Sequence, residues 1–326
     1  MNTISPDKTF NDPTWLDTEF PVLIIDDFLS QDKADLLVKD GIEYIQSKPE
    51  GQSIIHGGRI MMPWTLPQFE RLKESYSSWE NFSNSFSLDI FELFRKKITS
   101  YLPEDSDLER LKNEFLKSHM DYFDSYRLTK KLFNKDSYNK FQTAVDFNIR
   151  KIKPKSLAIV SLLRMMDSLY RRFLSITQFI TNKKPIIPLF DYSFSNEGYA
   201  REIHRDSDNR LLVVLLYLNT LDEHAEGGDL EIYKIKSNEL SNSLSSASYP
   251  AQPSHDQCTL QYKIKPRTGR LVMFLNQYNS YHAVSSMRNH SSGRHFIYGG
   301  FTYPSSIFNT KRRIPNRTLK TEMHIY

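Results

Sequence analysis

The sequence predicts an α+β protein with a mainly β core, and two observations support this fold class. From Ile186 onward, runs rich in β-branched and aromatic residues are broken by glycine-containing turns, a pattern typical of strands. From about Leu66 to Lys184 the chain has little glycine, and its apolar residues recur at helical spacing. We therefore expect a strand-rich core with flanking helices and a large helical insertion before it.

The N-terminal segment is expected to pack on this core. Residues 20–27 carry few charges and predict a strand, and Ser30 is a candidate N-cap for a helix with Leu36, Leu37 and Ile42 on one face. The predicted organisation is an N-terminal strand and helix, a helical insertion, the β core and a basic C-terminal tail, over residues 1–65, 66–184, 185–305 and 306–326.

Composition narrows the class of protein. The 326 residues can bury a full core, and a net charge of +4 is too small to imply nucleic-acid binding by itself. The single cysteine, Cys258, excludes an internal disulfide and fits a reducing compartment. The first residues lack the apolar core of a signal peptide, and no long uncharged apolar run predicts a membrane span. We therefore expect a cytoplasmic protein with no membrane partner.

A basic segment over residues 127–155 has two interpretations. Its lysines and arginines are interleaved with tyrosine and phenylalanine, as in some surfaces that bind nucleic acid. The same pattern fits a solvated helix face over an aromatic core. We favour the second interpretation and do not expect nucleic acid as a partner.

The residues with the clearest chemistry are His204 and Asp206, which lie at the edge of a strand-like region. In an extended chain, side chains at i and i+2 point to the same side, so both can reach one metal ion. His282, which follows the apolar run 271–275, is the candidate third ligand. Two histidines and one carboxylate that leave coordination positions open are the ligand set of non-haem Fe(II) oxygenases.

Two other histidines have a carboxylate nearby. His224-Ala-Glu226 lies in an acidic glycine turn, and His255-Asp256 lies in a Ser- and Asn-rich segment over residues 236–261. We interpret both pairs as surface residues. The segment 236–261 is predicted to be a long loop, which is either functional or disordered. Because functional loops tend to lie at the openings of rigid scaffolds, we expect this loop and the helical insertion to bind the primary substrate.

A longer series of motifs accompanies the candidate ligands. In order, it comprises His204-Arg-Asp206, the strand ending in Tyr217-Leu-Asn219, the turn Glu226-Gly-Gly228, the segment Pro266–Phe274, His282, and Gly293-Arg294 with the strand after it. This series, over residues 186–304 with a shorter echo at 20–29, resembles the 2-oxoglutarate- and Fe(II)-dependent oxygenases, in particular their prolyl 4-hydroxylase-like branch. The resemblance implies a double-stranded β-helix (jelly-roll) core. It also implies Fe(II), 2-oxoglutarate and O2 as cofactor and co-substrates, with ascorbate as a further candidate.

The resemblance also implies roles for individual residues. Arg294 is the cation expected to bind the distal carboxylate of 2-oxoglutarate, and Arg288, in a slightly lengthened turn before it, is the rival. Tyr217 matches a tyrosine whose hydroxyl assists that carboxylate in several relatives. One position departs from the pattern: Ser195 stands where relatives often carry a tyrosine, with Tyr192 upstream. This departure puts co-substrate contacts from that strand in doubt.

The expected reaction is hydroxylation of an unidentified primary substrate, with conversion of 2-oxoglutarate to succinate and CO2. A peptidyl residue such as proline is the substrate that the branch suggests, and a free amino acid, a sugar or a nucleotide intermediate is the alternative. Two other functions stay open on the sequence. One is a non-catalytic jelly-roll binding module, and the other is an oxygenase that acts on nucleic acid through the basic helical segment.

Overall fold

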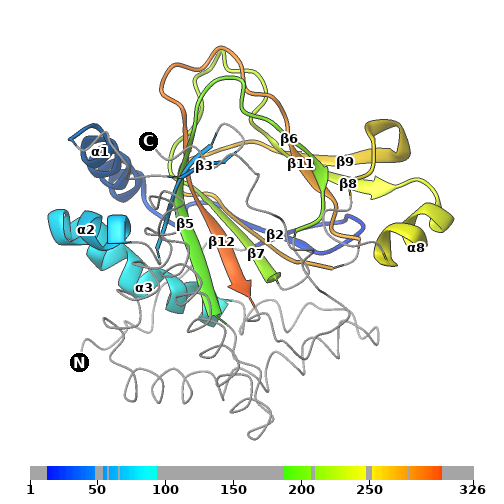
Figure 1. The fold of residues 1–326 in the computed structure, drawn as a ribbon, viewed down its shortest axis with the longest axis horizontal. Coiled ribbons are helices and arrows are strands. Elements are labelled where there is room, and N and C mark those ends of the chain that lie inside the picture. Colours follow the sequence, from blue (N-terminus) through cyan, green and yellow to red (C-terminus); the bar gives the residue numbers. More distant parts are fainter. Residues whose placement is uncertain are drawn as a thin grey trace, which may run out of the picture.

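The structure is a computed structural model, and it describes residues 13–47, 54–56, 59–64, 67–93, 187–206, 210–246, 252–277 and 279–302. Two β-sheets form the centre of this part of the chain, with helices beside them (Figure 1). The elements are, in order, β1 (Thr14–Leu16), β2 (Val22–Ile25), α1 (Gln31–Ser47), β3 (Ile54–His56), β4 (Arg59–Pro63), α2 (Pro67–Ser75), α3 (Ser77–Leu93), β5 (Ile187–Ser195), β6 (Arg201–His204), β7 (Arg210–Tyr217), β8 (Leu230–Ile235), α8 (Asn238–Ser246), the 3-10 turn η3 (His255–Gln257), β9 (Cys258–Ile264), β10 (Leu271–Leu275), β11 (His282–Val284) and β12 (Arg294–Thr302). The expectation of a mainly β core with flanking helices is confirmed for these residues.

The larger sheet has eight strands in the order β1-β2-β10-β7-β12-β5-β4-β3, and its neighbouring strands pair antiparallel. Strand β7 lies in the middle and is apolar almost throughout, with the sequence RLLVVLLY. A strand buried on both faces is expected to have such a continuous apolar run. Both faces of this sheet are therefore covered.

Alternate residues of β7 enter different cores. Leu212, Val214 and Leu216 join the cluster formed with α1, α2 and α3, and these helices lie on one side of the sheet (Figure 1). Val213, Leu215 and Tyr217 join a second cluster, which includes Leu230, Ile232 and Ile264 of the smaller sheet. Because side chains alternate along a strand, β7 separates a helix-facing core from a core between the two sheets.

The smaller sheet has four strands in the order β6-β11-β8-β9. Its outer face carries a third apolar cluster, which includes Ile203, Tyr233 and Ala283. Leu240 and Leu244 of α8 pack against this cluster. Helix α8 therefore covers the face of the smaller sheet that points away from the larger one, and Figure 1 shows it beside β8.

The prediction of a long loop over residues 236–261 is wrong for most of this segment. The structure has the helix α8, the turn η3 and the start of β9 within it, and residues 247–251 lie outside the described part. Leu240 and Leu244 are four residues apart and share one helix face, which packs on the sheet. The many serines and asparagines around them favour turns and hide this short apolar pattern.

Near the N-terminus the sequence predictions agree with the structure. The strand expected within residues 20–27 is β2, and the helix expected after Ser30 is α1, where the Ala34 amide donates to the Ser30 carbonyl. The predicted helical segment contributes α2 and α3. Its remainder up to residue 184, the basic segment 127–155 and the tail 306–326 lie outside the described residues. None of the described helices is long and apolar enough to cross a membrane.

Candidate functional site

His204 and His282 meet on the inner face of the smaller sheet. They end β6 and begin β11, and the antiparallel register pairs them directly across the two strands. Side chains of such a pair lie on the same face, and the two imidazole ring centroids are 4.4 Å apart. Ile203 and Ala283, one residue along each strand, point to the outer cluster instead. The pairing of β6 with β11 therefore brings together two histidines that lie far apart in the sequence.

Backbone carbonyls fix the protonation pattern of both rings. His204 Nδ1 lies 2.8 Å from the Glu202 carbonyl oxygen, and His282 Nδ1 lies 3.0 Å from the Ser280 carbonyl oxygen. A carbonyl only accepts hydrogen bonds, so each Nδ1 must carry the proton. In the neutral rings each Nε2 then has a free lone pair. A histidine that binds a metal is typically held in this way.

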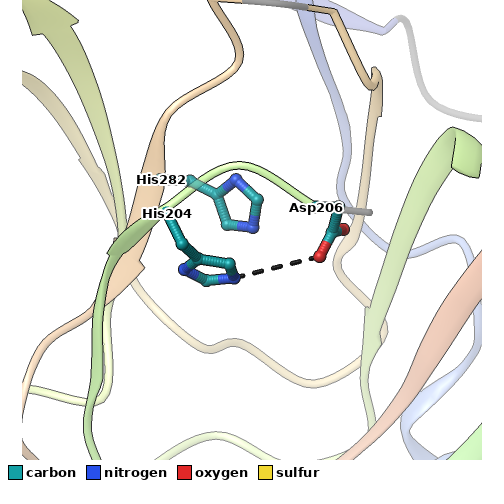
Figure 2. A group of neighbouring side chains, drawn as sticks. All are labelled: His204, Asp206 and His282. Carbon is teal, nitrogen blue, oxygen red and sulfur yellow. Dashed lines mark ion pairs between the residues drawn. The ribbon is translucent and has the colours of Figure 1, made fainter. Parts of the chain in front are cut away.

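Asp206 completes the group (Figure 2). Its Oδ1 is 3.8 Å from His204 Nε2, and one ligand atom from each of the three residues lies within 4.8 Å of the others. All three side chains are buried. Within the described ranges this is the one group of histidine, cysteine and acidic side chains that could hold a metal ion.

Tyr298 and Arg210 hold the Asp206 carboxylate. The Tyr298 hydroxyl donates to it and lies 2.9 and 2.8 Å from its two oxygens, and Arg210 Nε lies 3.8 Å from Oδ2. Burial would raise the pKa of Asp206, but Arg210, the two histidines and the Tyr298 hydrogen bond together lower it. The carboxylate is therefore ionised and fixed in orientation. Sequence analysis assigned no role to Tyr298, although its place on the same strand face as Arg294 was a usable signal.

Burial also keeps both imidazoles neutral. It is the largest cause that lowers the pKa of His204, to about 3, and it lowers the pKa of His282 as well. Neutral imidazoles are the form that binds a metal. Two neutral rings and one ionised carboxylate can therefore neutralise only one of the two charges of a divalent cation, and leave a positive centre for an anionic ligand.

Arg294 is a deeply buried cation near this group. Its side chain begins β12 and is 2% exposed, and its guanidinium lies over the Phe296 ring, 4.5 Å from the centroid. Nη1 donates to the Gly228 carbonyl oxygen at 2.5 Å, and Nε is buried without a partner. No carboxylate of the described residues forms an ion pair with it. Burial is the main cause that lowers the pKa of Arg294. An anion bound here would stabilise the guanidinium.

Beside Arg294 lie two hydroxyls that have no hydrogen-bond partner among the described residues. Tyr217 is fully buried, its ring centroid is 5.8 Å from the guanidinium carbon, and its hydroxyl has no hydrogen-bond partner. Burial raises the pKa of Tyr217 to about 12, so the hydroxyl keeps its proton and can donate it. Ser195 pairs with Arg294 across β5 and β12, and its buried hydroxyl is also unpartnered. These three side chains offer donors to one anion.

Tyr192 does not replace the tyrosine that relatives often carry at the Ser195 position. It belongs to the helix-facing cluster, where its ring lies 4.7 Å from the Trp79 ring, and its hydroxyl is 2.8 Å from His295 Nδ1. Ser195 itself faces Arg294. The group that this strand offers beside Arg294 is therefore a serine hydroxyl rather than a phenol.

The rival residues lie on the surface. His224, Glu226 and Arg288 are exposed, and the backbones of Glu226 and Arg288 form an isolated β-bridge. His255 and Asp256 are exposed as well. None of them belongs to the buried group around His204.

Comparison with known proteins shows which family has a similar sequence in this region. Residues 190–302 match the family model described as the 2OG-Fe(II) oxygenase superfamily. This part of the chain is therefore similar to that superfamily. The match includes the histidine pair, Asp206 and Arg294. Enzymes of the superfamily are oxygenases that use Fe(II), 2-oxoglutarate and O2, and the chain is an enzyme of this class.

Similar solved structures are distant. A prolyl-4-hydroxylase from Pseudomonas putida is 13% identical, and the match covers 88% of this chain and 95% of that one with a TM-score of 0.35. A prolyl 4-hydroxylase structure from Phytophthora capsici is 11% identical, and the match covers 86% of this chain and 58% of that one with a TM-score of 0.32. A prolyl hydroxylase from Trichoplax adhaerens, in complex with a hypoxia inducible factor peptide fragment, is 19% identical. This match covers 37% of this chain and 46% of that one with a TM-score of 0.25. No curated protein matches the sequence.

Proposed function

We propose that this oxygenase hydroxylates its substrate at an iron held by His204, Asp206 and His282. The observation that carries the proposal is the convergence of three buried ligand atoms within 4.8 Å, with both imidazole Nδ1 atoms bonded to backbone carbonyls. The donor set fits Fe(II), since two imidazoles and one carboxylate on one side leave positions open. When bound, Fe(II) supplies the chemistry that couples conversion of 2-oxoglutarate to succinate and CO2 with hydroxylation.

The group formed by Arg294, Tyr217 and Ser195 is the proposed binding site of the distal carboxylate of 2-oxoglutarate. The guanidinium presents donors, and the Tyr217 and Ser195 hydroxyls, both without partners, lie beside it. A carboxylate there would use all three groups and neutralise a buried charge. Phe296 and Phe274 belong to the apolar core between the sheets and would keep water away from this end.

The two sheets are inferred to form a double-stranded β-helix. Strands β5, β12, β7 and β10 are neighbours in the larger sheet, and β6, β11, β8 and β9 make the smaller one. Eight strands that alternate between two facing sheets in this way are the arrangement of a jelly roll. Residues 185–305 would be this catalytic core and 1–65 would extend its larger sheet, with a helical insertion at 66–184 and a tail at 306–326.

For the primary substrate we propose a peptidyl residue or a small molecule. The prolyl hydroxylases among the similar structures make a peptidyl proline the first to be tested. Arg210 and Tyr298 would hold the Asp206 carboxylate in a fixed orientation as it binds the metal.

The test is 2-oxoglutarate turnover by the purified protein with Fe(II), measured as succinate, in the presence of peptide, amino-acid and nucleic-acid pools. We expect His204→Ala, Asp206→Ala and His282→Ala each to abolish turnover. Each variant should also lose Fe(II) binding by calorimetry and keep its far-UV circular dichroism. His224→Ala is the matched control, because His224 is an exposed histidine. Full activity of the His282→Ala variant would disprove the third ligand, and stimulation by nucleic acid alone would favour the other substrate class.

A further inference from the structure

A second buried arginine, Arg59, lies on the same face of the larger sheet as Arg294. It begins β4 and is 8% exposed. The register pairs Arg59 with Ser195 on one side, and Ser195 with Arg294 on the other, so the three form one row across β4, β5 and β12. Side chains in such a row share a face of the sheet. Arg59 therefore points toward the space between the sheets.

The contacts of Arg59 do not satisfy its guanidinium. Nη2 donates to the thioether of Met61 at 3.0 Å, and the same atom lies 3.7 Å from Asp191 Oδ2. A thioether is a weak acceptor, and 3.7 Å is too long for a direct hydrogen bond. Nε is buried without a partner, and Asp191 Oδ1 is already bonded by the Ser193 hydroxyl. A buried guanidinium with so few acceptors among the described residues is suited to bind an anion.

The position of Arg59 connects it to the proposed metal centre. Its guanidinium carbon lies 4.8 Å from the Tyr298 ring centroid, and the hydroxyl of that ring bonds Asp206. It also lies 5.7 Å from the Phe296 ring, over which Arg294 lies at 4.5 Å. Arg59 is therefore separated from the ligand Asp206 by one tyrosine side chain.

The two arginines need different anions. Arg294 has the Tyr217 and Ser195 hydroxyls beside it, which complete a seat for one carboxylate. Arg59 instead lies on the side of Phe296 that carries Tyr298. The positive charge of Arg59 also disfavours the buried charge of Arg294, so a second negative group near Arg59 would stabilise both.

We propose that Arg59 binds a carboxylate of the primary substrate. This rests on the proposed function, because the carboxylate must lie within reach of a group that is hydroxylated at the metal. Asp191 orients the guanidinium from one side and leaves its other donors for the substrate. The carboxylate could be that of a free amino acid, the C-terminus of a peptide or an acidic side chain within one.

The experiment uses the full chain with Fe(II) and 2-oxoglutarate and measures stimulated succinate formation. The probes are free L-amino acids and short peptides, with and without acidic side chains, each also supplied with its carboxyl groups amidated. We expect stimulation by carboxylate forms and its loss on amidation. Stimulation by amino acids alone identifies the α-carboxylate as the source, and stimulation by peptides with capped termini identifies an acidic side chain. If the protein turns over 2-oxoglutarate, absence of any stimulation that depends on a carboxylate contradicts the proposal.

A variant then assigns the effect to Arg59. Arg59→Gln should raise the KM of the stimulating compound by about ten- to a hundredfold, the usual effect of a lost charge-assisted hydrogen bond. It should change the Kd of 2-oxoglutarate less than twofold. Arg288→Gln, at an exposed arginine, should change neither. An equal rise in the Kd of 2-oxoglutarate would place Arg59 in the co-substrate seat and overturn the proposal.

A binding measurement separates this result from the proposed function. With Zn(II), which has no redox chemistry, in place of Fe(II), calorimetry measures binding of each carboxylate probe without turnover. The expected result is binding to the wild type that is at least tenfold weaker in Arg59→Gln. If the wild type shows no turnover with Fe(II) but keeps this binding difference, the hydroxylase function fails and the carboxylate site stands. If the wild type and Arg59→Gln bind the carboxylate probe equally well, the proposed carboxylate site is disproved, whether or not turnover is observed.

Discussion

Arg294 differs from a surface arginine in both its burial and its partners. Among the described residues its one hydrogen-bond acceptor is the Gly228 carbonyl, and its neighbours are the aromatic rings of Phe296, Tyr199 and Tyr217. A guanidinium held among aromatic rings keeps its charge, since an arginine is not deprotonated in proteins. Such a residue costs folding free energy unless an anion binds to it.

The first prediction compares the two candidate arginines. Arg294→Leu should raise the Kd of 2-oxoglutarate about ten- to a hundredfold, equivalent to roughly 1.5–3 kcal/mol for a hydrogen bond to a charged group. Fe(II) binding should persist, because Arg294 does not contact the ligand residues. Calorimetry on Arg294→Leu and Arg288→Leu makes the comparison. If only Arg288→Leu weakens the binding of 2-oxoglutarate, the co-substrate is bound by the exposed turn and not by β12.

The sequence pattern predicted the three candidate metal ligands, but not the side chains that fix their orientation. The spacing of His204 and Asp206 and the distant His282 were visible, and the structure brings the three together. The hydrogen bond from the Tyr298 hydroxyl to Asp206 could not be predicted, because it joins a residue of β12 to a residue just after β6, 92 positions apart in the sequence. Local spacing can indicate ligands that lie close together in the sequence. Which distant side chain contacts them depends on the tertiary structure.

At the scale of elements, α8 shows why the serine-rich segment was misjudged. Leu240 and Leu244 pack on Ile203, Tyr233 and Ala283, on the face of the smaller sheet opposite to the two histidines. The argument for substrate binding by this segment assumed a loop at the opening of the core. For the helical part, packing on the outer face indicates a stabilising role instead.

The second prediction tests that role. Leu240→Ala with Leu244→Ala should lower the free energy of unfolding by about 2 kcal/mol, less than two fully buried leucines would cost, since both are half-buried. Urea unfolding measures the change, and Asn238→Ala, at an exposed position of α8, is the control. The Kd of 2-oxoglutarate should change less than twofold. Unchanged stability with a selective loss of substrate hydroxylation would support the substrate-binding role predicted from the sequence.

For the whole molecule, the sequence predicted what depends on local pattern. Apolar runs located β7, β8, β10 and β12, whereas the start of β9 lay in the predicted loop. Near the N-terminus, the strand β2 and the helix α1 were located. The pairing of β4 with β5 was not predictable, because Arg59 and Ser195 are far apart in the sequence and no local signal joins them. The polar row across these strands, and with it Arg59, therefore became visible only in three dimensions.

The stability of the whole molecule should depend on His295, a buried histidine outside the metal group. Its Nε2 lies 3.2 Å from the Ser292 carbonyl oxygen and must donate to it, so Nδ1 accepts from the Tyr192 hydroxyl at 2.8 Å. Burial is the largest cause that lowers the pKa of His295, to about 4 from the usual histidine value of 6.5. The folded protein therefore holds the neutral ring at a pH where the unfolded chain already binds a proton.

The third prediction follows from that difference in proton binding. Above pH 6.5 both states hold a neutral ring and the full stability is present. As the pH falls from 6.5 to 4, only the unfolded chain takes up the proton at this position, and stability is lost by roughly 3 kcal/mol in total. His295→Gln removes this titration, so its free energy of unfolding, although lower at pH 8, should fall less steeply with acid than that of the wild type. Urea unfolding of both proteins without metal at several pH values measures the two slopes. Because every other buried histidine is the same in the two proteins, equal slopes would show that His295 is not held neutral by the fold.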